Sequence, residues 1–202
     1  TDIDDDISAF ISNPMEHAEA SKIALFSIAD YAWNMDAYKS DASWRRAVRY
    51  LMPGHAAALQ VFASHNSDLG GNEHDFRREE SEQIRPALER LLDAYCREGK
   101  REVAAASAVT EECERMIASA DLLLASDENP ALIKEISPWL MQFKLLGEYG
   151  REVLCMLAAQ CDGKKTELEK AASHAKALQV LMKKIDATYN QNGFQPGVKT
   201  GS

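Results

Sequence analysis

Apolar residues recur at every third or fourth position along most of this chain, the spacing of helices that bury one face. The turn-rich stretch His65–Phe76 separates the first stripes from the last four, which are long and joined by short links. The pattern predicts an all-α fold, an antiparallel up-and-down helical bundle. The stripes lie at Ile23–Trp33, Trp44–Leu51, Ala56–Ala63, Ile84–Tyr95, Val109–Leu124, Leu132–Leu157 and Leu168–Ile185.

Prolines mark several predicted helix limits. Pro53 and Gly54 interrupt a helix that starts near Ser43, and Pro130 begins the longest one. Pro138 lies inside that longest helix, where a missing backbone donor and a steric clash are expected to cause a kink.

The N-terminal segment departs from the helical pattern. Ile7–Ser12 alternates apolar and polar residues as a strand does, and the alternation stops at Asn13 and Pro14. A single strand has no partner here, so it is either frayed or part of a sheet that lies elsewhere.

Asn13 has a simple structural interpretation from the residues alone. With Pro14 at the first helical position and Glu16 three residues on, Asn13 is placed as the N-cap of the first helix. That helix carries apolar residues on two sides, and we expect both to be buried.

Charge and composition exclude some functions. The chain has 202 residues and a net charge of −9, without the basic stripe that nucleic-acid binding requires. No apolar stretch reaches the ~20 residues of a membrane span. The opening letters TDIDDD lack the features of a signal peptide.

The sequence shows no catalytic or metal-binding machinery. None of the five histidines has a Glu three residues before it, as a carboxylate-bridged metal site requires. The cysteines form no C-x-x-C pair, and Cys113 and Cys155 fall on apolar helical faces where a thiol acts as a small hydrophobe. Asp4–Asp6 is predicted to be a solvated acidic end. We therefore expect no catalytic residue, metal or cofactor in this chain.

Several long motifs allow a further step: SNPMEHAEASKIALFSIADYAWN, HNSDLG, RREES, PWLMQFK and NQNGFQPGVKT. Together, from Ile7 to Thr200, they resemble bacterial members of glycoside hydrolase family 84. These are β-N-acetylglucosaminidases that include O-GlcNAcase homologues and proteins once labelled hyaluronidases.

The resemblance implies that the chain is a fragment of such an enzyme. Residues 1–66 would be the last strand and following helices of a catalytic barrel, and 67–77 a connecting loop. Residues 78–190 would be the post-catalytic helical bundle, followed by a linker at 191–202. The strand would then have lost its partners, and the first helix would pack against both barrel and bundle.

The resemblance also implies a role for Asn13. In the family, the Asn of the matching NP motif binds hydroxyls of the sugar, so Asn13 becomes a substrate-binding residue. Family members use the substrate's own acetamido oxygen as nucleophile, assisted by two aspartates upstream of the part matched here, which Asp4–Asp6 cannot replace.

Partners and location follow from the same resemblance. The fragment would bind the rest of the barrel and, through the parent, glycans or glycoproteins containing N-acetylglucosamine; the parent would be secreted or periplasmic. Apolar surface around Trp33, Trp44 and Trp139 would favour self-association. The alternative is a free-standing helical module that binds proteins or glycans.

Overall fold

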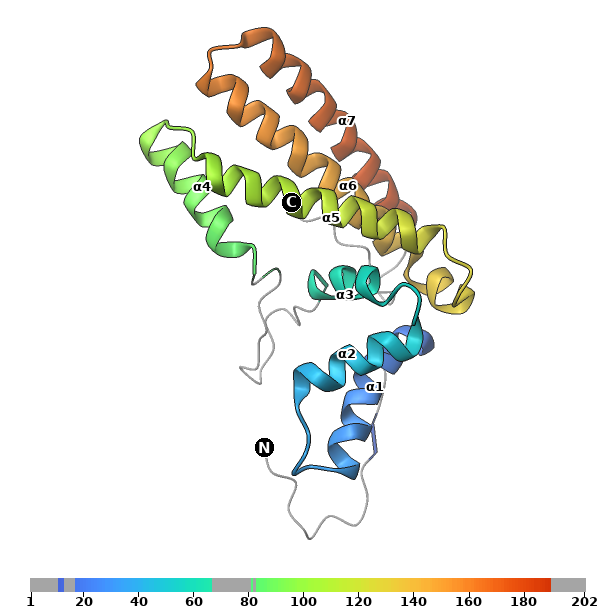
Figure 1. Cartoon of the computed structure of the whole chain (residues 1–202). Coiled ribbons are helices and arrows are strands. Elements are labelled where there is room, and N and C mark those ends of the chain that lie inside the picture. Colours follow the sequence, from blue (N-terminus) through green and yellow to red (C-terminus); the bar gives the residue numbers. More distant parts are fainter. Residues whose placement is uncertain (1–10, 13–16, 67–80, 82, 190–202) are drawn as a thin grey trace. The chain divides into compact units, whose positions relative to one another are not determined.

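The computed structural model describes residues 11–12, 17–66, 81 and 83–189. Within these ranges the regular elements are seven α-helices (Figure 1). Neighbouring helices run antiparallel, which confirms the all-α prediction. The helices are α1 (Ala18–Trp33), α2 (Ser40–Leu51), α3 (Ala56–Ser64), α4 (Arg85–Glu98), α5 (Val103–Leu124), α6 (Pro130–Cys161) and α7 (Lys165–Tyr189).

The predicted strand lies largely outside the described residues. Of its positions only Ile11 and Ser12 are described; neither belongs to a strand, and the Ile11 side chain is 93% exposed. No helix in the described ranges is long and apolar enough to cross a membrane.

The chain divides into two compact units. The first comprises residues up to 56 together with 126–136, and the second comprises 57–125 and the residues from 137 onward. Helix α6 therefore contributes its first seven residues to the first unit and the remainder to the second. The change falls between Ile136 and Ser137, next to Pro138, and α6 remains helical on both sides. The predicted kink at Pro138 stays a prediction.

In the first unit α1 packs against α2. The buried residues come mainly from α2 and from the first turns of α6. Helix α2 ends at Leu51 and α3 begins at Ala56, so the predicted interruption at Pro53–Gly54 is confirmed. The core of the unit contains Ala47, Val48, Leu51, Met52, Leu132 and Ile136.

The expected burial of α1 on two faces is wrong for this chain. Ser21 is its one buried residue, the larger apolar side chains are half-buried, and Trp33 is 90% exposed. The physical reason is that α1 has one face against α2 and the 126–136 segment, while no described element of its unit covers the other. Trp44 and Trp139 are half-buried.

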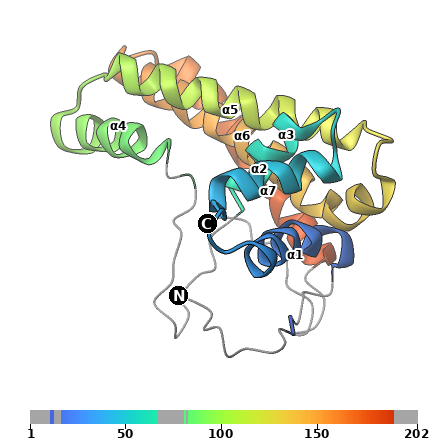
Figure 2. The same cartoon turned by 60° about the horizontal axis from the view of Figure 1, so that its bottom comes forward.

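In the second unit the chain folds back on itself twice, α4 against α5 and α6 against α7 (Figure 1 and Figure 2). Five buried residues from α4 and α5 form one cluster, and Leu154 and Leu157 of α6 pack onto it. A hydrogen bond also joins α6 to α7, in which Gln142 Nε2 donates to the Met182 carbonyl over 3.0 Å. The cluster consists of Ala87, Leu91, Ala105, Val109 and Cys113.

Two glycines let α5 and α6 approach closely. A Cβ on Gly147 would lie 2.9 Å from the Cys113 carbonyl oxygen and 2.9 Å from Ile117 Cγ1. A Cβ on Gly150 would lie 2.7 Å from Cys113 Sγ. All three distances are shorter than van der Waals contact, so the interhelical packing depends on the absence of side chains at these two positions.

We predict that Gly147→Ala lowers the thermal stability of the chain. Alanine favours a helix interior by about 1 kcal/mol over glycine, but the overpacking against the Cys113 backbone should cost about 1–3 kcal/mol. Thermal unfolding followed by circular dichroism measures the net change.

Gly150→Ala provides the comparison. Its new methyl group would meet the Cys113 sulfur alone, so its cost should shrink in a Cys113→Ala background. A Gly147→Ala protein with a raised unfolding temperature would contradict the proposed contact.

Candidate functional site

The sequence-predicted site residue, Asn13, lies outside the described residues, as do Pro14 and Glu16. The described residues resume at His17, immediately before α1. The candidate site therefore consists of the start of α1 and the residues that bind it.

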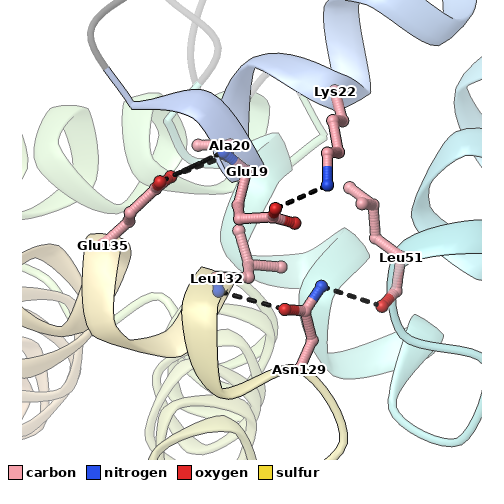
Figure 3. Close-up of polar contacts among 7 residues, drawn as sticks. All are labelled: Glu19, Ala20, Lys22, Leu51, Asn129, Leu132 and Glu135. Atoms are coloured by element: carbon pink, nitrogen blue, oxygen red, sulfur yellow. Dashed lines mark hydrogen bonds and ion pairs between the residues drawn. The ribbon is translucent and has the colours of Figure 1, made fainter.

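Helix α1 is capped by a residue distant in the sequence. His17 is its N-cap residue, with an extended backbone and no side-chain capping hydrogen bond. The Glu135 carboxylate instead accepts from Glu19 N at 2.9 and 3.1 Å and from Ala20 N at 3.0 Å (Figure 3). These two amides occupy the positions that an N-cap side chain ordinarily satisfies.

This arrangement replaces the predicted cap. We expected Asn13 to cap a helix starting at Pro14, whereas the helix starts at Ala18 and its amides bind Glu135. A carboxylate at this position also interacts favourably with the positive end of the helix dipole. No local sequence signal identifies Glu135, because 116 residues separate it from Glu19.

Asn129 connects two other helix ends beside this cap. Its Oδ1 accepts from Leu132 N at 3.1 Å, which caps the start of α6. Its Nδ2 donates to the Leu51 carbonyl at 3.4 Å, at the end of α2 (Figure 3). The predicted start of a helix at Asn129 and Pro130 is confirmed.

Glu19 adds a local ion pair to the same cluster. Its Oε1 lies 2.5 Å from Lys22 Nζ, one turn further along α1. The hydrogen bond from Lys22, and to a lesser extent that from Asn129, holds the pKa of Glu19 below its usual value. Glu19 therefore remains charged at neutral pH.

Glu128 holds the turn between α2 and α3. Its carboxylate accepts from Gly54 N at 2.7 Å and lies 2.9 Å from His55 Nδ1. The hydrogen bond from Gly54, followed by that from His55, lowers the pKa of Glu128. A Cβ on Gly54 would come within 3.3 Å of both carboxylate oxygens, so the turn and the carboxylate fit closely.

Together Glu128, Asn129 and Glu135 form what we call the clasp, three side chains of one short segment. The clasp binds the start of α1, the end of α2 and the turn before α3, all within the first unit. It leaves none of its three polar side chains without a partner and offers no pair of free carboxylates for acid–base chemistry. Its side chains hold helix ends and a turn in place through hydrogen bonds.

Other candidate chemistry does not assemble in the described part of the chain. No group of three or more metal-ligating side chains is present among the described residues. Cys113 is buried, as predicted, and burial raises its pKa. Cys155 is exposed, so the prediction that it acts as a small hydrophobe on an apolar face is wrong; its side chain lines a hollow.

That hollow lies among α4, α5 and α6 and has a volume of about 280 Å³. Leu91, Leu154 and Leu157 make its walls largely apolar. Tyr95 also lines it, and burial raises the pKa of Tyr95 to about 12, so the phenol stays protonated at neutral pH. Two of its charged lining residues are engaged by other groups, because Glu102 accepts from Ala105 N and Arg151 donates to Glu114, so they are not paired with each other as base and charge stabiliser.

We predict that acid weakens the clasp through Glu128. A carboxyl group whose pKa is lowered on folding stabilises the protein above its unfolded pKa of 4.5, and this contribution is lost as the pH falls through the lower folded value. Glu128→Gln should therefore reduce the thermal stability at pH 7 and flatten its decline between about pH 5 and pH 3. Unfolding temperatures measured across this range test the prediction.

Glu169→Gln, at an exposed position on α7, is the matched control and should keep the wild-type pH dependence. If Glu128→Gln and wild type lose stability in parallel on acidification, the clasp carboxylate makes no such contribution.

Comparison with known families gives two matches. Residues 80–202 match the family described as "Bacterial GH84, post-catalytic domain", which covers more than half of the chain. Residues 1–64 match the family described as "beta-N-acetylglucosaminidase".

Solved structures show the same fold. CpGH84B is 24% identical with a TM-score of 0.77, covering 88% of this chain and 30% of its own. CpGH84D is 26% identical with a TM-score of 0.72, covering 93% and 30%. A mutant O-GlcNAc hydrolase from Thermobaculum terrenum is 19% identical with a TM-score of 0.67, covering 87% and 40%. The chain thus spans 30–40% of the length of these proteins.

Proposed function

The chain belongs to the family of bacterial GH84 post-catalytic domains, and we propose from this that it is the non-catalytic C-terminal part of a β-N-acetylglucosaminidase. The observation that carries the proposal is the order of the two family matches, with the glycosidase family at 1–64 and the post-catalytic domain at 80–202. The parent would remove terminal β-linked N-acetylglucosamine.

The described residues support a structural role for this chain. Glu19, Glu128 and Glu135 are engaged by lysine, histidine or backbone amides. Ser126 Oγ lies 3.3 Å from His55 Nδ1, but the Glu128 carboxylate faces the same nitrogen at 2.9 Å, whereas in a catalytic triad the serine and the carboxylate face opposite nitrogens of the ring. In the proposed reaction the substrate's acetamido oxygen attacks the anomeric carbon, with two aspartates of the barrel assisting. This chain would contribute Asn13, whose amide would bind hydroxyls of the sugar.

We predict that the purified chain does not hydrolyse a chromogenic N-acetyl-β-glucosaminide, because the catalytic pair would lie on the missing part of the barrel. The full-length parent should show clear turnover under the same conditions. Clear turnover by the chain alone would overturn the proposal. A parent that is inactive would favour the alternative of a free-standing helical interaction module.

Asn13 is tested separately in the full-length parent. Loss of a hydrogen bond to a sugar hydroxyl in Asn13→Ala should lower kcat/KM by roughly tenfold to a hundredfold. Asn34→Ala, at the C-terminal end of α1, is the control and should leave kcat/KM unchanged. Equal kinetics for Asn13→Ala and wild type would remove Asn13 from the site.

A further inference from the structure

We propose that the hollow among α4, α5 and α6 binds a small monocarboxylic acid with a hydrocarbon body, and that Arg101 pairs with its carboxylate. The residues that line the hollow belong to α4, to α5 with the two residues before it, and to α6, and all of them lie in the second unit. The proposal does not depend on the glycosidase function proposed above.

The size and the walls of the hollow favour a small and largely apolar ligand. Its volume of about 280 Å³ lies slightly below the range of about 300–1,000 Å³ that is typical of ligand pockets. Leu91, Leu154 and Leu157 line it, and the last two are only half-buried. A hydrocarbon body that covers these side chains would remove apolar surface from water, and this burial favours binding.

Several polar groups of the lining are already engaged within the protein. Glu102 and Arg151 make the contacts described above, and the Thr110 hydroxyl donates to the Ala106 carbonyl over 2.7 Å. The head group of a ligand is therefore selected by the polar groups of the lining that are held less tightly.

Arg101 is the cationic residue of the lining with the looser ion pair. Its Nη1 lies 3.7 Å from Asp162 Oδ2, beyond hydrogen-bond distance, and its side chain is 51% exposed. The guanidinium therefore has donors available to a ligand. A planar carboxylate accepts two parallel hydrogen bonds from such a fork, which makes it the best-matched head group.

Tyr95 places a second donor close to Arg101. Its hydroxyl oxygen is buried without a hydrogen-bond partner among the described residues, while the neighbouring Cys161 thiol donates to the Gly99 carbonyl over 3.8 Å. Burial and then the Cys161 thiol raise the pKa of Tyr95 to about 12, and the charge of nearby Arg101 opposes this rise. A buried donor without an acceptor is unfavourable, so an acceptor oxygen bound at this end of the hollow would give the neutral phenol the partner that it lacks.

Cys155 makes binding measurable at the hollow itself. Its thiol is exposed and lines the hollow, so a bound acid should shield it from alkylation. The test follows the reaction of Cys155 with iodoacetamide in the purified chain at neutral pH by peptide mass spectrometry, with octanoate as the probe. At about ten times its Kd, octanoate leaves roughly a tenth of the sites free, so the alkylation of Cys155 should slow roughly tenfold.

A control thiol separates binding at the hollow from a general effect of the probe. The thiol introduced by Ala177→Cys, at an exposed position on α7, should react at the same rate with and without octanoate. Absence of protection at Cys155, or equal slowing at Cys155 and at the control thiol, would overturn the proposal and leave the glycosidase function untouched.

Two related compounds test the two parts of the ligand in the wild-type chain. Butyrate has a shorter hydrocarbon body, so its Kd should be roughly a hundredfold higher than that of octanoate. Octanamide keeps the body and loses the charge, so its Kd should be roughly tenfold higher. Equal Kd values for octanoate and either compound would contradict the proposed ligand class.

Variants test the anchor of the carboxylate. Arg101→Gln should raise the Kd of octanoate by roughly tenfold and that of octanamide by less, because it removes the charge that pairs with the carboxylate. Arg97→Gln removes the same charge from an exposed position on α4 and should match wild type. Equal increases in the two variants would overturn the role of Arg101. If Arg101→Gln fails to fold, the comparison of octanoate with octanamide in the wild-type chain decides.

Discussion

A helix that begins without its own capping side chain must find an acceptor for its first amides elsewhere, and this requirement organises the first unit. Glu135 supplies that acceptor from 116 residues away. Because the carboxylate belongs to α6, the start of α1 is tied to a segment that follows α5 in the chain.

Asn129 and Glu128 make similar hydrogen bonds to the end of α2 and to the turn before α3. Three side chains of one short segment therefore bind backbone groups at three places in the first unit. Leu132 and Ile136 of the same segment are buried, and they anchor it in the core of the first unit.

The second unit depends on a different constraint, the distance between helix backbones. Gly147 and Gly150 leave room for the Cys113 carbonyl and thiol, and α5 and α6 pack closely there. The long α6 therefore takes part in both units. Polar side chains at its start bind other elements of the first unit, and glycines near its middle allow close packing in the second. Pro138 lies next to the point where it passes from one to the other.

The capping of α1 by Glu135 bears on how the two family matches relate to each other. The clasp joins them directly, because Glu135 lies within the post-catalytic match and caps a helix within the β-N-acetylglucosaminidase match. The compact units of the structure group 126–136 with the N-terminal residues, and the domain bounds expected from the sequence stay a prediction.

The sequence by itself determined the helical class of the chain, the helix limits at Pro53–Gly54 and Asn129–Pro130, and the burial of Cys113, because these follow from local periodicity and backbone chemistry. It also carried the motifs that resemble the family now shown. It did not determine the burial of α1 or of Cys155, because burial depends on which neighbour covers a face. Nor did it identify Glu135, because a glutamate inside a helix looks the same in sequence whether it faces solvent or caps a distant helix. Only the tertiary structure decided that, by bringing the unpaired amides of Glu19 and Ala20 to its carboxylate.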